Sequence, residues 1–75
     1  MAKGTFVRVE IGFDGGQILS WLVTSDSADA LERKLSAGGS GTLALDAQEG
    51  TITLVLDRVL YAKRFAREAR VGFDV

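Results

Sequence analysis

The chain has 75 residues, a net charge of −1 and 47% hydrophobic residues, and it contains no Cys and no His. A chain this short forms one small domain with little stability of its own, and it cannot be reinforced by disulfides. Thiolate and imidazole metal sites and catalysis by a thiol or an imidazole base are also excluded. We therefore expect no metal, no cofactor and no catalytic residue, because acids in small proteins mostly lie on solvated surface.

No apolar run approaches the ~20 residues of a membrane-spanning helix. We expect no membrane partner and a cytoplasmic location. The prediction for the whole chain is a single domain over residues 1–75, with an ordered core over about 5–65 and a basic C-terminal tail over 66–75.

Residues 5–13 alternate between apolar and other side chains, which is typical of a half-buried strand. Asp14-Gly15-Gly16 then provides glycines for a tight turn, and residues 17–24 alternate in the same way. The two segments predict a hairpin. The side chains expected on its inner face are Val7, Val9, Ile11, Leu19, Trp21 and Val23.

Ser25-Asp26-Ser27 supplies oxygens that can cap the first N–H groups of a helix. Ala28, Leu31 and Leu35 then form one apolar stripe at helical spacing. Gly38-Gly39 is expected to end the helix, because glycine readily adopts the left-handed conformation beyond a C-terminus.

Residues 42–46 and 51–56 predict two further strands, separated by a turn over 47–50. The segment after Asp57 fits either a strand or a helix, since it alternates but contains good helix formers from Leu60 to Arg70. We predict a strand through about Arg64 and a short helical turn near residues 66–70.

This order predicts an α+β domain: a small, mainly antiparallel sheet with one helix, in the order ββαββ(β). A helix between strands of one sheet predicts a right-handed crossover. Over residues 5–56 the order resembles the ubiquitin-like β-grasp roll, and that resemblance implies the same fold.

Three short motifs resemble an uncharacterised family of small actinobacterial proteins. They are Val-x-Val-Glu-Ile-Gly over residues 7–12, the step from Arg58-Val59 to Tyr61, and the closing Ala69-Arg70-Val71-Gly72-Phe73. Members of that family share a similar opening strand and a similar ending. The resemblance implies a bacterial protein and brings no established activity.

One helix cannot cover both faces of the predicted sheet. The face opposite the helix still carries apolar side chains, and such a cluster is typical of an interface. We therefore expect a homo-oligomer; the alternative cover is the C-terminal tail, through Val71 and Phe73. The candidate interface residues are Phe6, Ile18, Leu22 and Val55.

The last eighteen residues carry five cations against two acids, whereas residues 1–57 carry four cations against eight acids. This asymmetry indicates an anion or nucleic-acid surface, with Tyr61 and Phe65 as stacking faces. The alternative, which the net charge of −1 favours, is that these cations pair with acids of the first half. The candidate residues are Arg58, Lys63, Arg64, Arg67 and Arg70.

The sequence therefore predicts a non-enzymatic, self-associating interaction module. The alternative is a protein that binds RNA, single-stranded DNA or another anion through its basic C-terminal segment. A nucleic-acid partner is thus possible but less favoured than a second copy of the chain.

Overall fold

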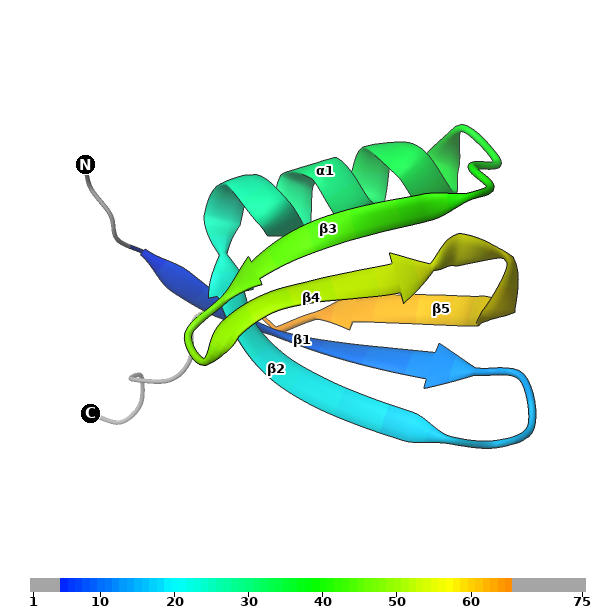
Figure 1. Ribbon diagram of the computed structural model, residues 1–75, viewed down its shortest axis with the longest axis horizontal. Helices are drawn as coiled ribbons and strands as arrows, with labels where there is room; N and C mark the ends of the chain where they lie inside the picture. The colour runs from blue at the N-terminus through cyan, green and yellow to red at the C-terminus, as the bar shows by residue number, and fades with distance from the viewer. Residues whose placement is uncertain (1–4, 66–75) are drawn as a thin grey trace.

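The computed structural model describes residues 5–65. They form one helix and one five-stranded antiparallel sheet, which confirms the α+β class (Figure 1). No helix in this part of the chain is long and apolar enough to cross a membrane. The elements are β1 (Phe6–Phe13), β2 (Ile18–Thr24), α1 (Ser25–Ser36), β3 (Thr42–Ala47), β4 (Gly50–Val55), the 3-10 helix η1 (Leu56–Arg58) and β5 (Val59–Arg64).

β1 and β2 form the predicted hairpin, with a register that runs from Phe6 opposite Thr24 to Gly12 opposite Ile18. The turn contains two glycines with φ near +90°, a conformation that other residues rarely adopt. β5 pairs with the other edge of β1 and ends at Arg64, as predicted. The helical turn predicted near residues 66–70 lies outside the described residues.

The residue that caps α1 is Thr24, one position before the predicted capping residues, because Thr24 Oγ1 accepts a hydrogen bond from the Ser27 N–H at 3.1 Å. Ser27, one of the predicted capping residues, does not cap the helix. It is buried, and its Oγ accepts a hydrogen bond from the Asp46 N–H at 2.8 Å. The start of α1 is thereby fixed to β3. The helix ends before the glycine pair as predicted: Gly38 has a φ of 71°, and the Gly39 N–H donates to the Lys34 carbonyl at 2.7 Å.

The strands on either side of α1 are neighbours at one register position only. Val23 lies opposite Ala47 in antiparallel register, and the Gln48 N–H donates to the Leu22 carbonyl at 2.9 Å. The predicted right-handed crossover is wrong, since it requires parallel strands. The physical reason is the Ser27 contact, which brings the end of β3 to the end of β2. The likeness to a β-grasp roll is not confirmed.

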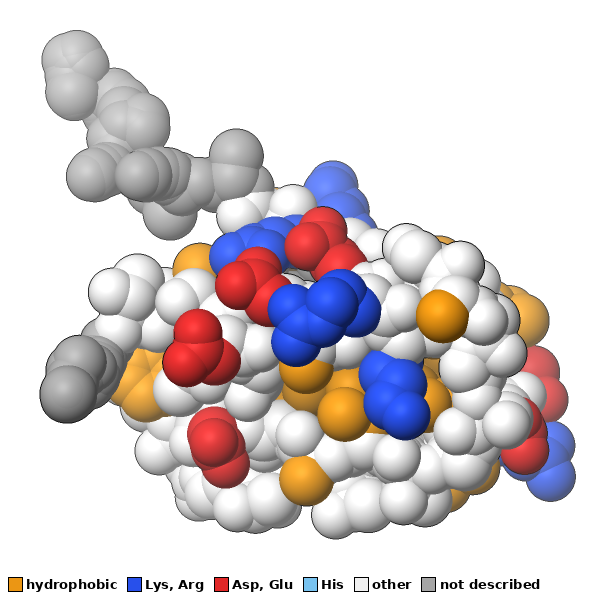
Figure 2. All heavy atoms as spheres, turned by 90° about the horizontal axis from the view of Figure 1, so that it is seen from above, with side chains coloured by type: hydrophobic (Ala, Val, Ile, Leu, Met, Phe, Trp, Pro, Cys, Tyr) orange, Lys and Arg blue, Asp and Glu red, His pale blue; other side chains and the backbone are white. Residues whose placement is uncertain are grey.

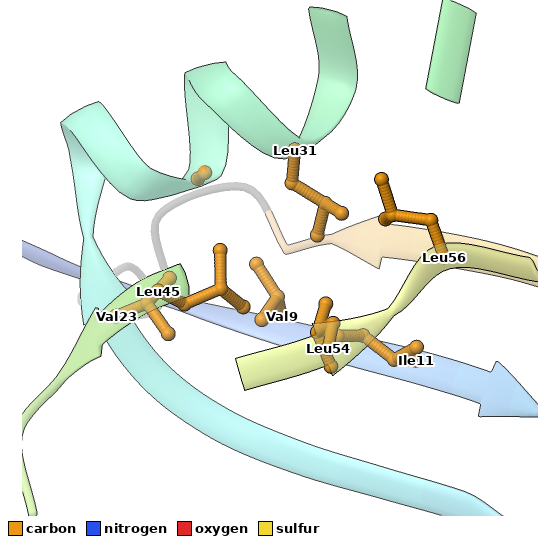
Figure 3. Packing of buried hydrophobic residues seen from close by; sticks show 8 residues of the cluster. Val9, Ile11, Val23, Leu31, Leu45, Leu54 and Leu56 are labelled. Atoms are coloured by element: carbon orange, nitrogen blue, oxygen red, sulfur yellow. The ribbon is translucent and has the colours of Figure 1, made fainter. Parts of the chain in front are cut away.

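The sheet therefore has two parts, β5–β1–β2 and β3–β4, in the strand order β4-β3-β2-β1-β5. The core lies between these parts and beneath α1, where the labelled side chains point toward one another (Figure 3). η1 begins at Leu56, so the strand predicted over residues 51–56 ends one residue early, and η1 leads the chain from β4 to β5. The buried core residues are Val9, Ile11, Val23, Ala28, Leu31, Leu45, Leu54 and Leu56.

Two isoleucines of the same hairpin allow a matched test of this core. Ile11 is fully buried, whereas Ile18 is 57% exposed. We expect Ile11→Val to lower the free energy of unfolding by about 0.5–1.5 kcal/mol, because one buried methyl group is lost. Ile18→Val should change it by less than about 0.5 kcal/mol. Urea denaturation at low protein concentration measures both, and equal losses would contradict this core.

Candidate functional site

The face of β5–β1–β2 that points away from the core is called the outer face below. On β1 its residues alternate with the buried Val9 and Ile11. The register then places Glu10 between Lys63 and Ser20, and Gly12 between Tyr61 and Ile18. The outer face consists of Phe6, Arg8, Glu10, Gly12, Ile18, Ser20, Leu22, Tyr61, Lys63 and Phe65.

Three of the four predicted interface residues lie on this face. Ile18 is 57% exposed, Leu22 is 41% exposed and Phe6 is 39% exposed. The fourth, Val55, is also exposed but lies on β4, in the other part of the sheet. The structure thus places Phe6, Ile18 and Leu22 on one face, with Phe6 and Ile18 at opposite ends of the hairpin, and places Val55 in the other part of the sheet.

Two residues expected on the covered inner face are only partly covered. Leu19 lies directly opposite the fully buried Ile11, yet it is 38% exposed. Trp21 lies opposite the buried Val9 and is half-buried. The β3–β4 hairpin pairs with β2 only at Val23, and Trp21 packs against the edge of the core cluster. Sequence reasoning missed both residues because alternation assigns a face without showing what covers it.

Two cations on the outer face converge on one aromatic ring. The Lys63 Nζ lies 4.6 Å and the Arg8 guanidinium carbon 5.4 Å from the centre of the Phe65 ring. Both are cation–π contacts. Within residues 5–65 neither cation has a carboxylate at salt-bridge distance. Glu10 opposes Lys63 in the register but accepts a hydrogen bond from the Tyr61 hydroxyl at 2.9 Å.

The other predicted cations do not join this cluster. Arg58 pairs with Asp14 at 3.2 Å beside the hairpin turn. Arg64 points to the helix side of the sheet, where it pairs with Asp29 at 2.7 Å and with Glu32 at 3.2 Å. Acidic and basic side chains are accordingly interspersed over α1 (Figure 2). Arg67 and Arg70 lie outside the described residues.

Tyr61 lies flat against the backbone of β1. A Cβ atom added at Gly12 would come within 2.1 Å of its ring, so glycine is needed for this close approach. The hydrogen bond from the Tyr61 hydroxyl to Glu10 raises the pKa of the phenol above its usual 10.0, with smaller contributions from burial and from the negative charge of Glu10. The neutral phenol is therefore the form that the fold favours.

A ligand site usually occupies a groove, and acidic side chains are the main metal ligands that this chain can offer. An open groove between the end of α1 and β5 is lined mainly by apolar side chains, with Asp57 at its edge. Among residues 5–65 there is no group of three or more acidic side chains that could hold a metal ion.

Tyr61 is the only tyrosine of the chain, so its ionisation can be measured directly by phenolate absorbance. We expect a pKa above 10.0 in the wild-type protein and a fall toward 10.0 in Glu10→Gln. Because the folded-state pKa is raised, the stabilising effect is present below pH 10.0 and is lost as pH rises through that raised pKa. Asp46→Asn, which removes a distant charge, is the control; an equal fall in both variants would contradict the Glu10 contact.

Comparison with known proteins finds no matching family model, no matching curated protein and no matching solved structure.

Proposed function

We propose that this protein is a non-enzymatic interaction module that associates with itself through the outer face. The observation that carries this proposal is the exposure of Phe6, Ile18 and Leu22 on one side of a single hairpin. Isolated exposed apolar residues are ordinary, whereas a cluster on one face is typical of an interface. A small domain without disulfides also gains stability when a partner covers such a cluster.

The free energy that self-association can gain from these side chains is moderate. Covering these three partly exposed side chains in two copies would contribute on the order of 5 kcal/mol from apolar burial. Association itself costs at least about 4 kcal/mol in lost freedom of motion. We therefore expect assembly that depends on concentration.

The first test changes the charge of the contact surface. Ile18→Lys/Leu22→Lys places two cations among the exposed apolar side chains of the outer face and is expected to lower the assembly toward the 8.0 kDa of one chain. Sedimentation and light scattering over micromolar to millimolar concentrations measure the mass. Ser36→Lys/Ser40→Lys adds the same charge away from the outer face and should keep the wild-type mass. A wild-type protein that stays at 8.0 kDa throughout would contradict self-association.

A second candidate function is binding of RNA, single-stranded DNA or another anion, and one specific observation supports it. Arg8 and Lys63 converge on Phe65 without a carboxylate partner among residues 5–65. Unpaired cations beside aromatic rings are a common way to bind phosphates and bases. This candidate differs from the prediction in its residues, since Arg8 enters the cluster while Arg58 and Arg64 are held in ion pairs.

The matching experiment removes two cations at a time. If the cluster binds nucleic acid, Arg8→Gln/Lys63→Gln should weaken binding of a single-stranded oligonucleotide at low salt by about tenfold or more. Arg33→Gln/Arg58→Gln removes the same charge elsewhere and should have a smaller effect. Fluorescence anisotropy at low and moderate salt measures both. Absent binding at low salt, or equal losses in the two variants, would exclude the cluster as the site.

The β-grasp likeness, the bacterial origin implied by the actinobacterial resemblance and the cytoplasmic location stay predictions. Neither candidate function depends on them.

A further inference from the structure

The strand register arranges the side chains of the outer face in rows. The central strand β1 marks the rows with Phe6, Arg8, Glu10 and Gly12. Beside the last three of these, in the same order, β2 contributes Leu22, Ser20 and Ile18. On the other side β5 contributes Phe65, Lys63 and Tyr61. The two middle rows thus carry opposite charges on β1, a cation at Arg8 and an acid at Glu10.

Neither of these two charges forms an ion pair within residues 5–65. Arg8 is exposed and lies over the Phe65 ring, and Glu10 accepts one hydrogen bond from the Tyr61 hydroxyl. Glu49 lines the same small hollow as Arg8 but is not at salt-bridge distance from it. A guanidinium has five donors and a carboxylate can accept about four hydrogen bonds. Each group therefore has hydrogen-bonding capacity that the described part of the chain does not use.

We propose that two copies of the chain pack outer face to outer face, around a two-fold axis that crosses the strands between the rows of Arg8 and Glu10. The inference rests on the proposed self-association and specifies its register. The axis places Arg8 of each copy opposite Glu10 of the other, so the contact contains two equivalent ion pairs. The strands of the two faces run in opposite directions.

The alternation of charge along β1 selects this register. A two-fold contact applies the same surface twice. If the axis crossed the strands at the row of Arg8, each Arg8 would face its own copy, and an axis at the next row would do the same to Glu10. An axis along β1 would bring both like pairs together. Like charges placed face to face oppose binding, so the axis between the two rows is the favoured one.

The same axis joins apolar side chains that lie apart in one chain. Phe6 and Ile18 are at opposite ends of the hairpin. Because the axis reverses the strands, Phe6 of each copy lies diagonally next to Ile18 of the other. The two Leu22 side chains meet beside the axis, where the small Ser20 leaves room for them. The exposed apolar residues are thus covered in the assembly although they are not contiguous in one chain.

A second copy fits this surface better than an anionic partner does. An anion would be attracted by Arg8 and Lys63 but would meet the negative charge of Glu10 in the same rows. The copy offers an acid where the first chain has a cation, and a cation where it has an acid. The contact is small, since stable interfaces use roughly 20–30 residues a side and the outer face has ten. We therefore expect a dimer that dissociates on dilution.

Charge reversal tests the two ion pairs. Arg8→Glu and Glu10→Arg each bring like charges together and should each raise the dissociation constant of the dimer by about tenfold or more. The double variant Arg8→Glu/Glu10→Arg restores unlike charges and should return to within about threefold of the wild type. Arg33→Glu makes the same charge change on α1 and should keep the wild-type constant. Sedimentation equilibrium measures all four, and Arg8→Gln or Glu10→Gln replaces a single variant that circular dichroism shows to be unfolded.

The chain has no Cys, so single cysteines report the register. Leu22→Cys lies beside the axis and should be linked to its own copy by a short bis-maleimide. Ile18→Cys is also on the outer face, but three rows separate it from its own copy, roughly 20 Å along the strands. It should not link when alone, whereas a mixture of Ile18→Cys and Phe6→Cys should link.

The register is overturned if a single charge reversal keeps the wild-type constant, if the double variant stays as weak as the single ones, or if Arg33→Glu weakens the dimer equally. It is also overturned if Ile18→Cys links to its own copy more readily than Leu22→Cys. Should Ile18→Lys/Leu22→Lys still dissociate the assembly in that case, self-association through the outer face stands and this register alone fails. A wild-type chain that stays at 8.0 kDa at millimolar concentration contradicts both.

Discussion

The single backbone pair between Val23 and Ala47 decides which parts of this molecule are covered. It joins the β3–β4 hairpin to the rest of the sheet at the end of β2, next to the point where Ser27 binds the Asp46 N–H. From there the hairpin extends over β1 and leaves the first half of β2 only partly covered. Ile11 and Leu19 show the result: they face each other across one ladder, and one is buried while the other is exposed.

Because successive side chains of a strand point to opposite faces, β5 directs Lys63 and Arg64 to opposite sides of the sheet. Arg64 points to α1 and pairs with Asp29 and Glu32, whereas Lys63 points outward to Phe65. Exposed ion pairs contribute at most about 1 kcal/mol each, but this one joins β5 to a helix far from it in sequence. Part of the positive charge is thus used inside the chain, and the charge asymmetry of the sequence overstates the cationic surface.

Local patterns were sufficient for the hairpin, the helix, its glycine terminus and the outer-face positions of Phe6, Ile18 and Leu22. Each depends on residues close in sequence: alternation, a turn or a helical stripe. The order of the strands and the partial exposure of Leu19 and Trp21 could not be predicted in this way, because they depend on where a distant hairpin meets β2. One of the two alternatives predicted that cations near the C-terminus pair with acids of the first half of the chain. The particular pair of Arg58 with Asp14 could not be predicted.

The two candidate functions use different halves of the outer face. These halves differ in how many of their side chains already contact other residues of the chain. On the β5 side, Tyr61 bonds Glu10 and both cations contact Phe65, so an anion would have to compete with existing interactions. On the β2 side, the Ile18 and Leu22 side chains are exposed among residues 5–65, and on the outward edge there the Leu22 carbonyl accepts a bond from Gln48. Covering the β2 side removes apolar surface from water. The larger gain in free energy therefore comes from a contact at β2, which is why self-association is the stronger of the two candidates.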